Sequence, residues 1–178
     1  MKANQPKPAI LRRFFAGLTE NAFHARLGLA DPPLTDYLTD MLVRFIRSDA
    51  IYRIRDVHGR KLAEVAEMMI EAELRVGIAR RDVHRHIGDF ILFWTGVYPD
   101  ALCRLKGPQS KDQFLDYCSQ GKRAYYIAST IASDNSDDAD SEVLGRLSNQ
   151  FEICIQGLTE VRREWERNEG GGQLPLLI

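Results

Sequence analysis

The sequence predicts an all-α protein, built as a single-domain helical bundle of five or six helices with a flexible C-terminal tail. Apolar residues recur at helical spacing along almost the whole chain, and convincing strand-like alternation is missing. Residues that typically start and stop helices lie between the apolar stripes. The composition, 44% apolar and 28% charged, is that of an ordinary globular domain. We therefore expect a disordered N-terminal arm over residues 1–9, the bundle over residues 10–167 and the tail over residues 168–178.

The first part of the chain predicts two helices and then an irregular link. The first helix ends near Gly28, and Asp31 with two prolines behind it is a typical start for the second. The second helix runs to about Asp49, and residues 50–61 alternate only weakly. The apolar stripes of the two helices are Leu11, Phe14, Leu18, Ala22, Ala25 and Leu29, and then Leu34, Leu38, Met41 or Leu42, and Phe45.

The rest of the chain predicts longer helices. They cover about residues 61–76, stopped by Gly77, about residues 80–98, ended by Pro99, and residues 110–132. After an acidic loop over residues 134–142, whose last residues can cap it, a final helix runs to about residue 167. The final helix carries the apolar stripe Leu144, Leu147, Phe151, Cys154, Leu158, Val161 and Trp165. On helix 110–132 the small residues Gly121, Ala124, Ala128 and Ala132 predict the close approach of another helix.

A charged residue lies inside the apolar arc of helix 61–76, and a histidine inside that of helix 80–98. If residues 77–79 make a tight turn, the helices run antiparallel, and the register that pairs Val76 with Val83 also pairs Glu73 with His86. Burying one of these groups alone is costly, whereas a hydrogen-bonded pair is tolerated. We therefore predict a buried polar pair, with Glu71 on the outer face beside Arg75 and with His84 pointing away from His86.

The predicted Glu73–His86 pair has two interpretations. The favoured one is a structural hydrogen bond that fixes the register of the two helices. The other is an acid–base pair or half of a metal site, because histidine changes charge near neutral pH. The sequence has no Cys-x-x-Cys, no Glu-x-x-His and no catalytic motif, so no catalytic residue, metal or cofactor is expected.

Charge and cysteine usage restrict the classes of function. The net charge of −1 argues against a protein whose whole surface binds polyanions. Cys103, Cys118 and Cys154 are scattered and odd in number, which favours reduced thiols in the cytoplasm. No stretch reaches the roughly 18 apolar residues of a membrane span, and no secretory signal is present. The sequence indicates no oligomeric state.

Basic residues gather in two clusters separated by helix 61–76. That helix would hold them about 24 Å apart, so one continuous groove is not expected. A solvated surface is the favoured interpretation, and nucleic-acid binding is the alternative. The residues are Arg53, Arg55, Arg60 and Lys61 in the first cluster, and Arg80, Arg81 and Arg85 in the second.

Two segments, HIGDFILFWTGVYPDAL and YCSQGKRAYYIAS, resemble a family of bacterial all-helical proteins that is uncharacterised. The resemblance covers most of residues 10–165. It implies a single all-α domain in a bacterial protein, and it implies no activity, substrate or site residue.

The chain ends in GGGQLPLLI, three glycines followed by an apolar peptide. The segment over residues 173–178 resembles the peptide by which bacterial replication and repair proteins bind the DNA polymerase sliding clamp. The positions that match its pattern are Gln173, Leu174, Leu176, Leu177 and Ile178, with Pro175 at the tolerant place. A glycine linker would let the peptide reach a partner, and proline would lower the entropy lost on ordering it. Docking on its own domain and an extension without a role are the alternatives.

The resulting functional prediction is a cytoplasmic helical protein that acts by protein binding, tethered to the sliding clamp by this peptide. The first alternative is a small-molecule- or metal-binding bundle, or an enzyme, that uses Glu73 and His86. The second is nucleic-acid binding through the basic clusters.

Overall fold

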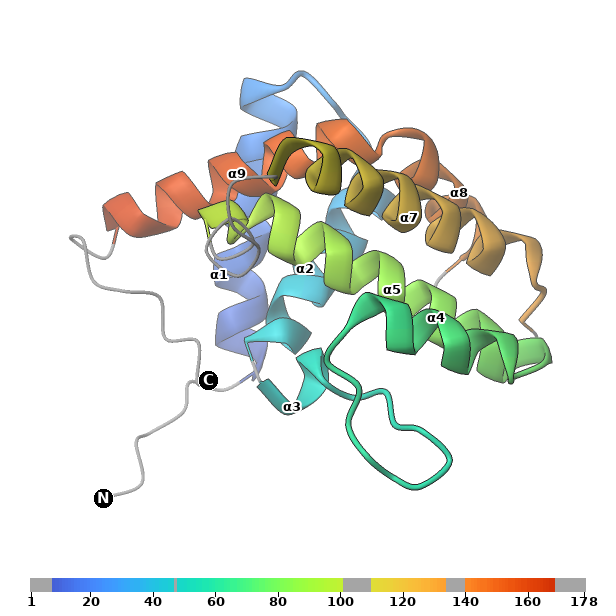
Figure 1. Cartoon of the computed structure of the whole chain (residues 1–178). Helices are drawn as coiled ribbons and strands as arrows, with labels where there is room; N and C mark the ends of the chain where they lie inside the picture. Colours follow the sequence, from blue (N-terminus) through green and yellow to red (C-terminus); the bar gives the residue numbers. More distant parts are fainter. Residues whose placement is uncertain (1–7, 47, 101–109, 134–139, 169–178) are drawn as a thin grey trace.

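The computed structural model describes residues 8–46, 48–100, 110–133 and 140–168, and these residues form eight α-helices, one π-helix and no strand (Figure 1). The helices are α1 (Pro8–Glu20), the π-helix η1 (Asn21–Arg26), α2 (Pro32–Phe45), α3 (Ser48–Ile51), α4 (Val65–Glu73), α5 (Gly77–Gly96), α7 (Ser110–Thr130), α8 (Ser141–Asn149) and α9 (Phe151–Asn168). The predicted all-α class is confirmed. None of the helices in the described ranges is long and apolar enough to cross a membrane.

Helix α5 lies at the centre of the molecule and packs against α2, α4, α7 and α9 (Figure 1). Its segment from His86 to Phe93 is buried at every position. This agrees with the apolar character of the segment all round the helix. The helices α1 and α2 form one neighbouring pair, and α7 runs along α5.

Glycines let α5 and α7 approach closely. A Cβ at Gly88 would lie 2.7 Å from Cδ1 of Tyr125, and a Cβ at Gly121 would lie 3.1 Å from the side chain of Ile91. Ala124 and Ala128 are also buried. The small residues of helix 110–132 therefore serve close helix packing as predicted, with the exception of Ala132, which is exposed beyond the helix end.

Several helix ends follow the sequence signals. The Asp31 side chain accepts a hydrogen bond from the Leu34 backbone N–H at 3.2 Å and caps α2. Asp140 caps α8 by accepting from the Glu142 N–H at 3.0 Å. Gly77 has a φ of 56°, a left-handed conformation that glycine adopts without strain. It reverses the chain between α4 and α5, so residues 61–97 are a helical hairpin and not one helix.

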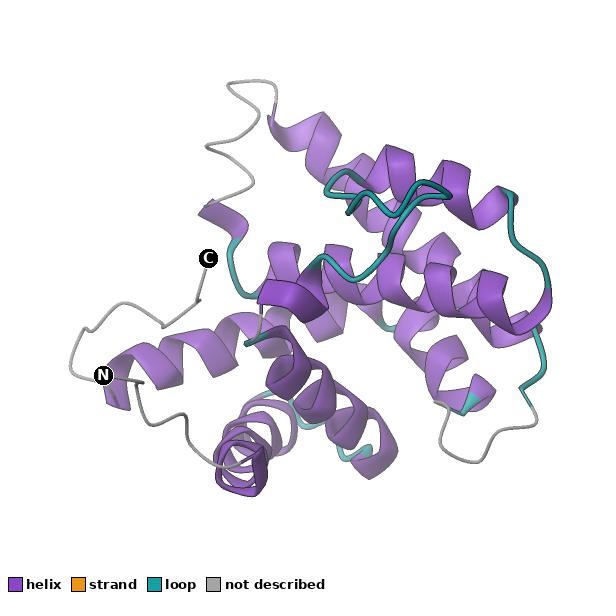
Figure 2. Ribbon diagram, turned by 90° about the horizontal axis from the view of Figure 1, so that it is seen from below, coloured by secondary structure: helices purple, strands orange, loops and turns teal. Residues whose placement is uncertain are grey.

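Three elements differ from the prediction. The irregular link predicted over residues 50–61 is found as a loop over residues 52–64 with an isolated bridge between Arg55 and Lys61, but it is longer than predicted, so α4 begins only at Val65 (Figure 2). The last helix is two helices, α8 and α9, separated at Gln150, although every residue of its predicted stripe is buried. The π-helix η1 follows α1, and Phe15 and Phe23 are buried instead of Phe14 and Ala25.

The wider turn of a π-helix changes which side chains face the core. It allows Phe23 to pack against Gly157 of α9, at a place where any side chain at residue 157 would collide with the ring. Arg26 also reaches α9 and pairs with Glu160 at 2.7 Å. The irregular turn therefore joins the α1–α2 pair to the last helix.

Candidate functional site

The predicted Glu73–His86 pair is not formed. The Glu73 side chain is 65% exposed and accepts from Arg80 at 3.1 Å. His86 is 1% exposed, and its Nε2 lies 2.9 Å from the carbonyl oxygen of Ile51. Its Nδ1 accepts a 3.2 Å hydrogen bond from Nε of Arg53. These bonds require the tautomer with hydrogen on Nε2, and burial together with the Arg53 charge lowers the pKa of His86 to about 4.

The pair fails because α4 presents a different face to the core. The buried residues of α4 are Val65, Met68, Glu71 and Ala72, whereas Ala66 and Glu73 are exposed. Glu71 was expected on the outer face, but it is only 6% exposed. Its predicted partner does neutralise it, because Arg75 donates to Glu71 at 2.9 Å and also to the carbonyl of Arg55 at 3.0 Å. With Arg75 as its partner, the Glu71 carboxylate avoids most of the free-energy cost of burying an unpaired charge.

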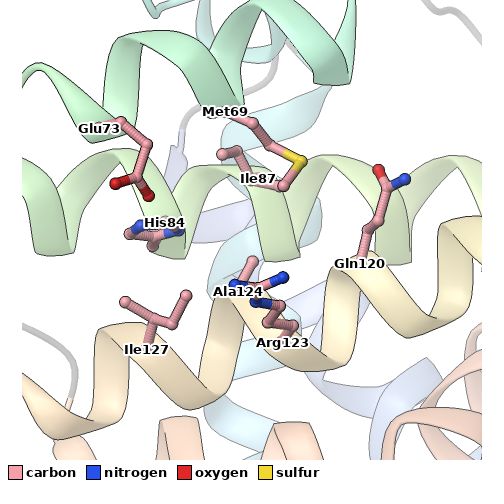
Figure 3. Close-up of a pocket in the computed structure, with 8 residues that line it drawn as sticks. All are labelled: Met69, Glu73, His84, Ile87, Gln120, Arg123, Ala124 and Ile127. Atoms are coloured by element: carbon pink, nitrogen blue, oxygen red, sulfur yellow. The ribbon is translucent and has the colours of Figure 1, made fainter.

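The histidine near Glu73 is His84, two residues before the predicted one and on nearly the opposite side of α5. Both residues line a cavity of about 30 Å³ between α4, α5 and α7 (Figure 3). Figure 3 shows the carboxylate of Glu73 above the imidazole ring of His84, with Arg123 reaching in from α7. His84 is 3% exposed, and burial, followed by the charge of Arg80, lowers its pKa. The imidazole is therefore neutral at physiological pH.

A second cluster of polar residues surrounds Asp89 in the middle of α5. Asp89 is 2% exposed, and its Oδ1 accepts hydrogen bonds from the hydroxyls of Tyr37 at 2.6 Å and Tyr125 at 2.8 Å. Its Oδ2 accepts from Arg44 at 2.9 Å. Burial raises the pKa of each tyrosine well above the ordinary value, so both hydroxyls keep their protons and donate to Asp89. The cluster joins α2, α5 and α7, and three donors compensate its carboxylate.

Sequence reasoning missed Asp89, although one signal was present. It is the only acidic residue between Arg85 and Pro99, a stretch that is otherwise mostly apolar. A carboxylate in the middle of a central core helix requires partners. Its partners come from residues far away in the chain, which no local pattern identifies.

The predicted basic clusters are largely engaged within the molecule. Arg53 contacts both His86 and the carbonyl of Asp82, at 3.2 and 3.3 Å, so parts of the two clusters meet. Arg81 is 1% exposed and lies in the core. Three further arginines pair with carboxylates: Arg60 with Asp56 and Glu67, Arg80 with Glu73, and Arg85 with Asp82. Arg55 donates to the carbonyl of Gly59. Lys61 is exposed, and its backbone forms the bridge to Arg55.

A larger cavity of about 350 Å³ lies between α1, η1 and α2. The hydroxyls of Thr19 and Thr39 line it and are bonded to each other at 2.6 Å. Asp31 also lines it and accepts from Arg146 at 2.7 Å. The buried hydroxyls of this cavity are therefore paired. Nε2 of His84, in the smaller cavity, has no hydrogen-bond partner among the described residues.

The remaining candidate residues are outside the described ranges. These are the clamp-like peptide positions Gln173, Leu174, Leu176, Leu177 and Ile178. The predicted N-terminal arm and tail also lie outside, except that residues 8 and 9 belong to α1 and residue 168 to α9. Within the described ranges, no group of three His, Cys, Asp or Glu residues is placed to hold a metal ion.

Comparison of the chain with family models, with curated proteins and with solved structures finds no match. The resemblance to a family of bacterial helical proteins therefore stays a prediction. The structure itself shows an all-α fold and the arrangement of its helices.

Proposed function

We propose that this protein acts by binding a partner protein in the bacterial cytoplasm, and that residues 173–178 engage the DNA polymerase sliding clamp. The observation that carries the proposal is the match of Gln173, Leu174, Leu176, Leu177 and Ile178 to the clamp-binding pattern, behind three glycines. An extended peptide of this kind inserts apolar side chains into a preformed groove, and the glutamine amide hydrogen-bonds at its entrance.

The packing of α9 supports a role for the tail outside the folded core. The last buried residue of α9 is Trp165, whose ring contacts Phe14 and Phe15 of α1 at centroid distances of 6.2 and 4.8 Å. The described core is therefore covered at this end by residues that precede Asn168.

The reach of the tail also bears on the alternative that it docks on its own domain. Apolar residues are exposed at the turn between α4 and α5, namely Ile70, Leu74, Val76 and Ile78, which we call the α4–α5 corner. Leu158 of α9 contacts Gly96 at the opposite end of α5. At the rise of an α-helix, α5 is about 28 Å long, and α9 continues about 15 Å beyond Leu158. Figure 1 shows this last part of α9 running away from α4. Because an extended chain places Leu174 at most about 20 Å from Asn168, docking on its own domain would favour exposed apolar residues near α9, such as Ile10 and Phe14, over the corner.

The ion pairs of the basic residues favour a protein partner over nucleic acid. Arg60, Arg80 and Arg85 each contact a carboxylate, and Arg81 is buried. Few of the predicted basic residues are left to contact phosphates. The enzyme alternative loses its basis because Glu73 and His86 lie apart.

The test is binding of the purified full chain to an immobilised bacterial sliding clamp. We expect saturable binding, and a loss of about tenfold or more for Leu176→Ala, since burial of a leucine contributes about 1.5–3 kcal/mol. Gln173→Ala should also weaken binding. Pro175→Ala is the matched control at the tolerant position and should cost less than about fivefold. Absence of binding by the full chain, or equal binding by all variants, would refute the proposal.

A further inference from the structure

The cavity between α4, α5 and α7 contains a buried polar atom that lacks a partner. Nε2 of His84 makes no hydrogen bond within the described residues, although the residue is 3% exposed. A buried nitrogen left unpaired costs free energy, and such atoms in native proteins usually have a partner. The cavity of about 30 Å³ in front of it has room for one or two water-sized groups. A small polar ligand would satisfy this nitrogen.

The charges around the cavity decide the sign of that ligand. Three charged side chains face His84, namely Glu73 from α4, Arg80 from α5 itself and Arg123 from α7. Both oxygens of Glu73 lie close to Nη2 of Arg80, at 3.1 and 3.2 Å, so these two charges offset each other. Arg123 makes no hydrogen bond or ion pair with any described residue. The excess charge at the cavity is positive, which disfavours a metal cation and favours an anion.

The walls of the cavity restrict the size and shape of the anion. Ile87, Ala124 and Ile127 are apolar walls, and the only other polar lining residue is Gln120, whose amide donates to Asp116 at 2.8 Å. Apart from the second N–H of that amide, the donors that remain are the ring of His84 and the guanidinium of Arg123, which Figure 3 shows on neighbouring sides of the cavity. Two donors match the two oxygens of a carboxylate, and guanidinium–carboxylate hydrogen bonds are among the strong ones.

We propose that this cavity binds the carboxylate group of a small organic acid, with Nε2–H of His84 and the guanidinium of Arg123 as its donors. Arg123 is exposed, so the rest of such an acid extends toward solvent. The cavity itself has room for little more than the two carboxylate oxygens.

Proton uptake accompanies binding. In the free protein, burial and the charges of Arg80 and Arg123 lower the pKa of His84, and Glu73 opposes them. A bound carboxylate adds a negative charge beside the ring and raises this pKa. The affinity for the acid therefore increases as the pH falls.

The test uses the full chain and the histidine ring signals in long-range ¹H–¹⁵N NMR spectra. The protein is titrated separately with sodium acetate, sodium chloride and sodium sulfate at equal ionic strength. We expect a saturable change at His84 with acetate alone, together with an increase of its apparent pKa. A saturable change with chloride alone, or equal changes with all three anions, would refute the carboxylate site.

Variants separate the site from general salt effects. Arg123→Gln should weaken acetate binding about tenfold, because it removes a charged donor from an exposed position. Arg13→Gln, at an exposed position of α1, is the matched control and should bind as the wild type does. His84→Gln keeps a donor but cannot take up a proton. Its acetate binding, followed by the backbone amide signal of Ala124 on the cavity wall because the ring signal is lost, should persist without its pH dependence. Unchanged acetate binding by Arg123→Gln would contradict the proposal.

Discussion

Tyr125 on α7 donates a 2.8 Å hydrogen bond to Oδ1 of Asp89 on α5, and its ring packs directly on the backbone of Gly88. One tyrosine thus satisfies a buried carboxylate and fills the space left by the missing side chain beside it. The same carboxylate oxygen accepts from Tyr37 on α2. Two neighbouring residues of α5 therefore determine how α2 and α7 are placed on it.

Removal of the Tyr125 hydroxyl should destabilise the protein. We expect Tyr125→Phe to lower the free energy of unfolding by about 2 kcal/mol, because the lost hydrogen bond is made to a charged acceptor. Asp89→Ala should cost about 3–5 kcal/mol, since it leaves Arg44 and both hydroxyls without their acceptor. Urea denaturation measures both changes. Tyr126→Phe is the control, because Tyr126 is 61% exposed, and a similar loss in that variant would contradict the role of Asp89.

A side chain at Gly88 should also destabilise the protein. The Cβ of Gly88→Ala would lie 2.7 Å from Cδ1 of Tyr125, and overpacking of this kind costs about 1–3 kcal/mol. Gly17→Ala in α1 meets no atom within 4 Å, and it should gain about 0.5–1 kcal/mol from helix propensity. Thermal unfolding of the two variants should show shifts of opposite sign. Shifts of the same sign would mean that Gly88 does not set the distance between α5 and α7.

His86 should make stability depend on pH. Its pKa is about 4 in the folded protein and about 6.5 in the unfolded chain. As the pH falls below about 6.5, the unfolded state binds a proton first, so stability is lost progressively down to about pH 4. The free energy of unfolding falls by up to about 3 kcal/mol near pH 4, and this decrease is absent well above pH 6.5.

The measurement is the free energy of unfolding at pH 5 and pH 8. His86→Gln can retain a contact with the Ile51 carbonyl, and it should show a smaller loss at pH 5 than the wild type. His24→Gln, on the exposed side of η1, should behave as the wild type does. An identical pH dependence in His86→Gln would show that other groups control acid stability.

Cys154 should be unreactive in the folded protein. Its side chain is fully buried, and burial raises the pKa of the thiol to about 12. Iodoacetamide at pH 8 should leave Cys154 unmodified in the native state and modify it in urea, as mass spectrometry of the peptides would show. Rapid labelling without denaturant would indicate that α9 separates from α5 more readily than its packing implies.

The features predicted correctly depend on local sequence signals. The helices, the Asp31 cap and the Gly77 reversal follow from apolar periodicity and from residues with special backbone preferences. The seven residues of the stripe predicted from Leu144 to Trp165 are all buried, but no glycine or proline marks the break at Gln150. Periodicity identifies what is buried more reliably than it identifies where one helix gives way to the next.

The candidate site was predicted less well because it depends on contacts between distant residues. Glu73 and His86 lie on the predicted helices, but their side chains do not face each other, since α4 buries Glu71 with Arg75 as its partner. Asp89 finds its donors at residues 37, 44 and 125. The cavity beside His84 requires side chains from three helices. Such arrangements are set by the packing of the whole chain.

The contact between Phe23 and Gly157 has a consequence for the order in which the chain folds during synthesis. The ring of Phe23, the side chain of Asn21 and the guanidinium of Arg26 all find their partners on α9, at residues 157, 164 and 160. A nascent chain that lacks α9 leaves Phe23 of η1 without the neighbour on which its ring packs. The N-terminal segment therefore emerges early but completes its packing only when nearly the whole domain has left the ribosome.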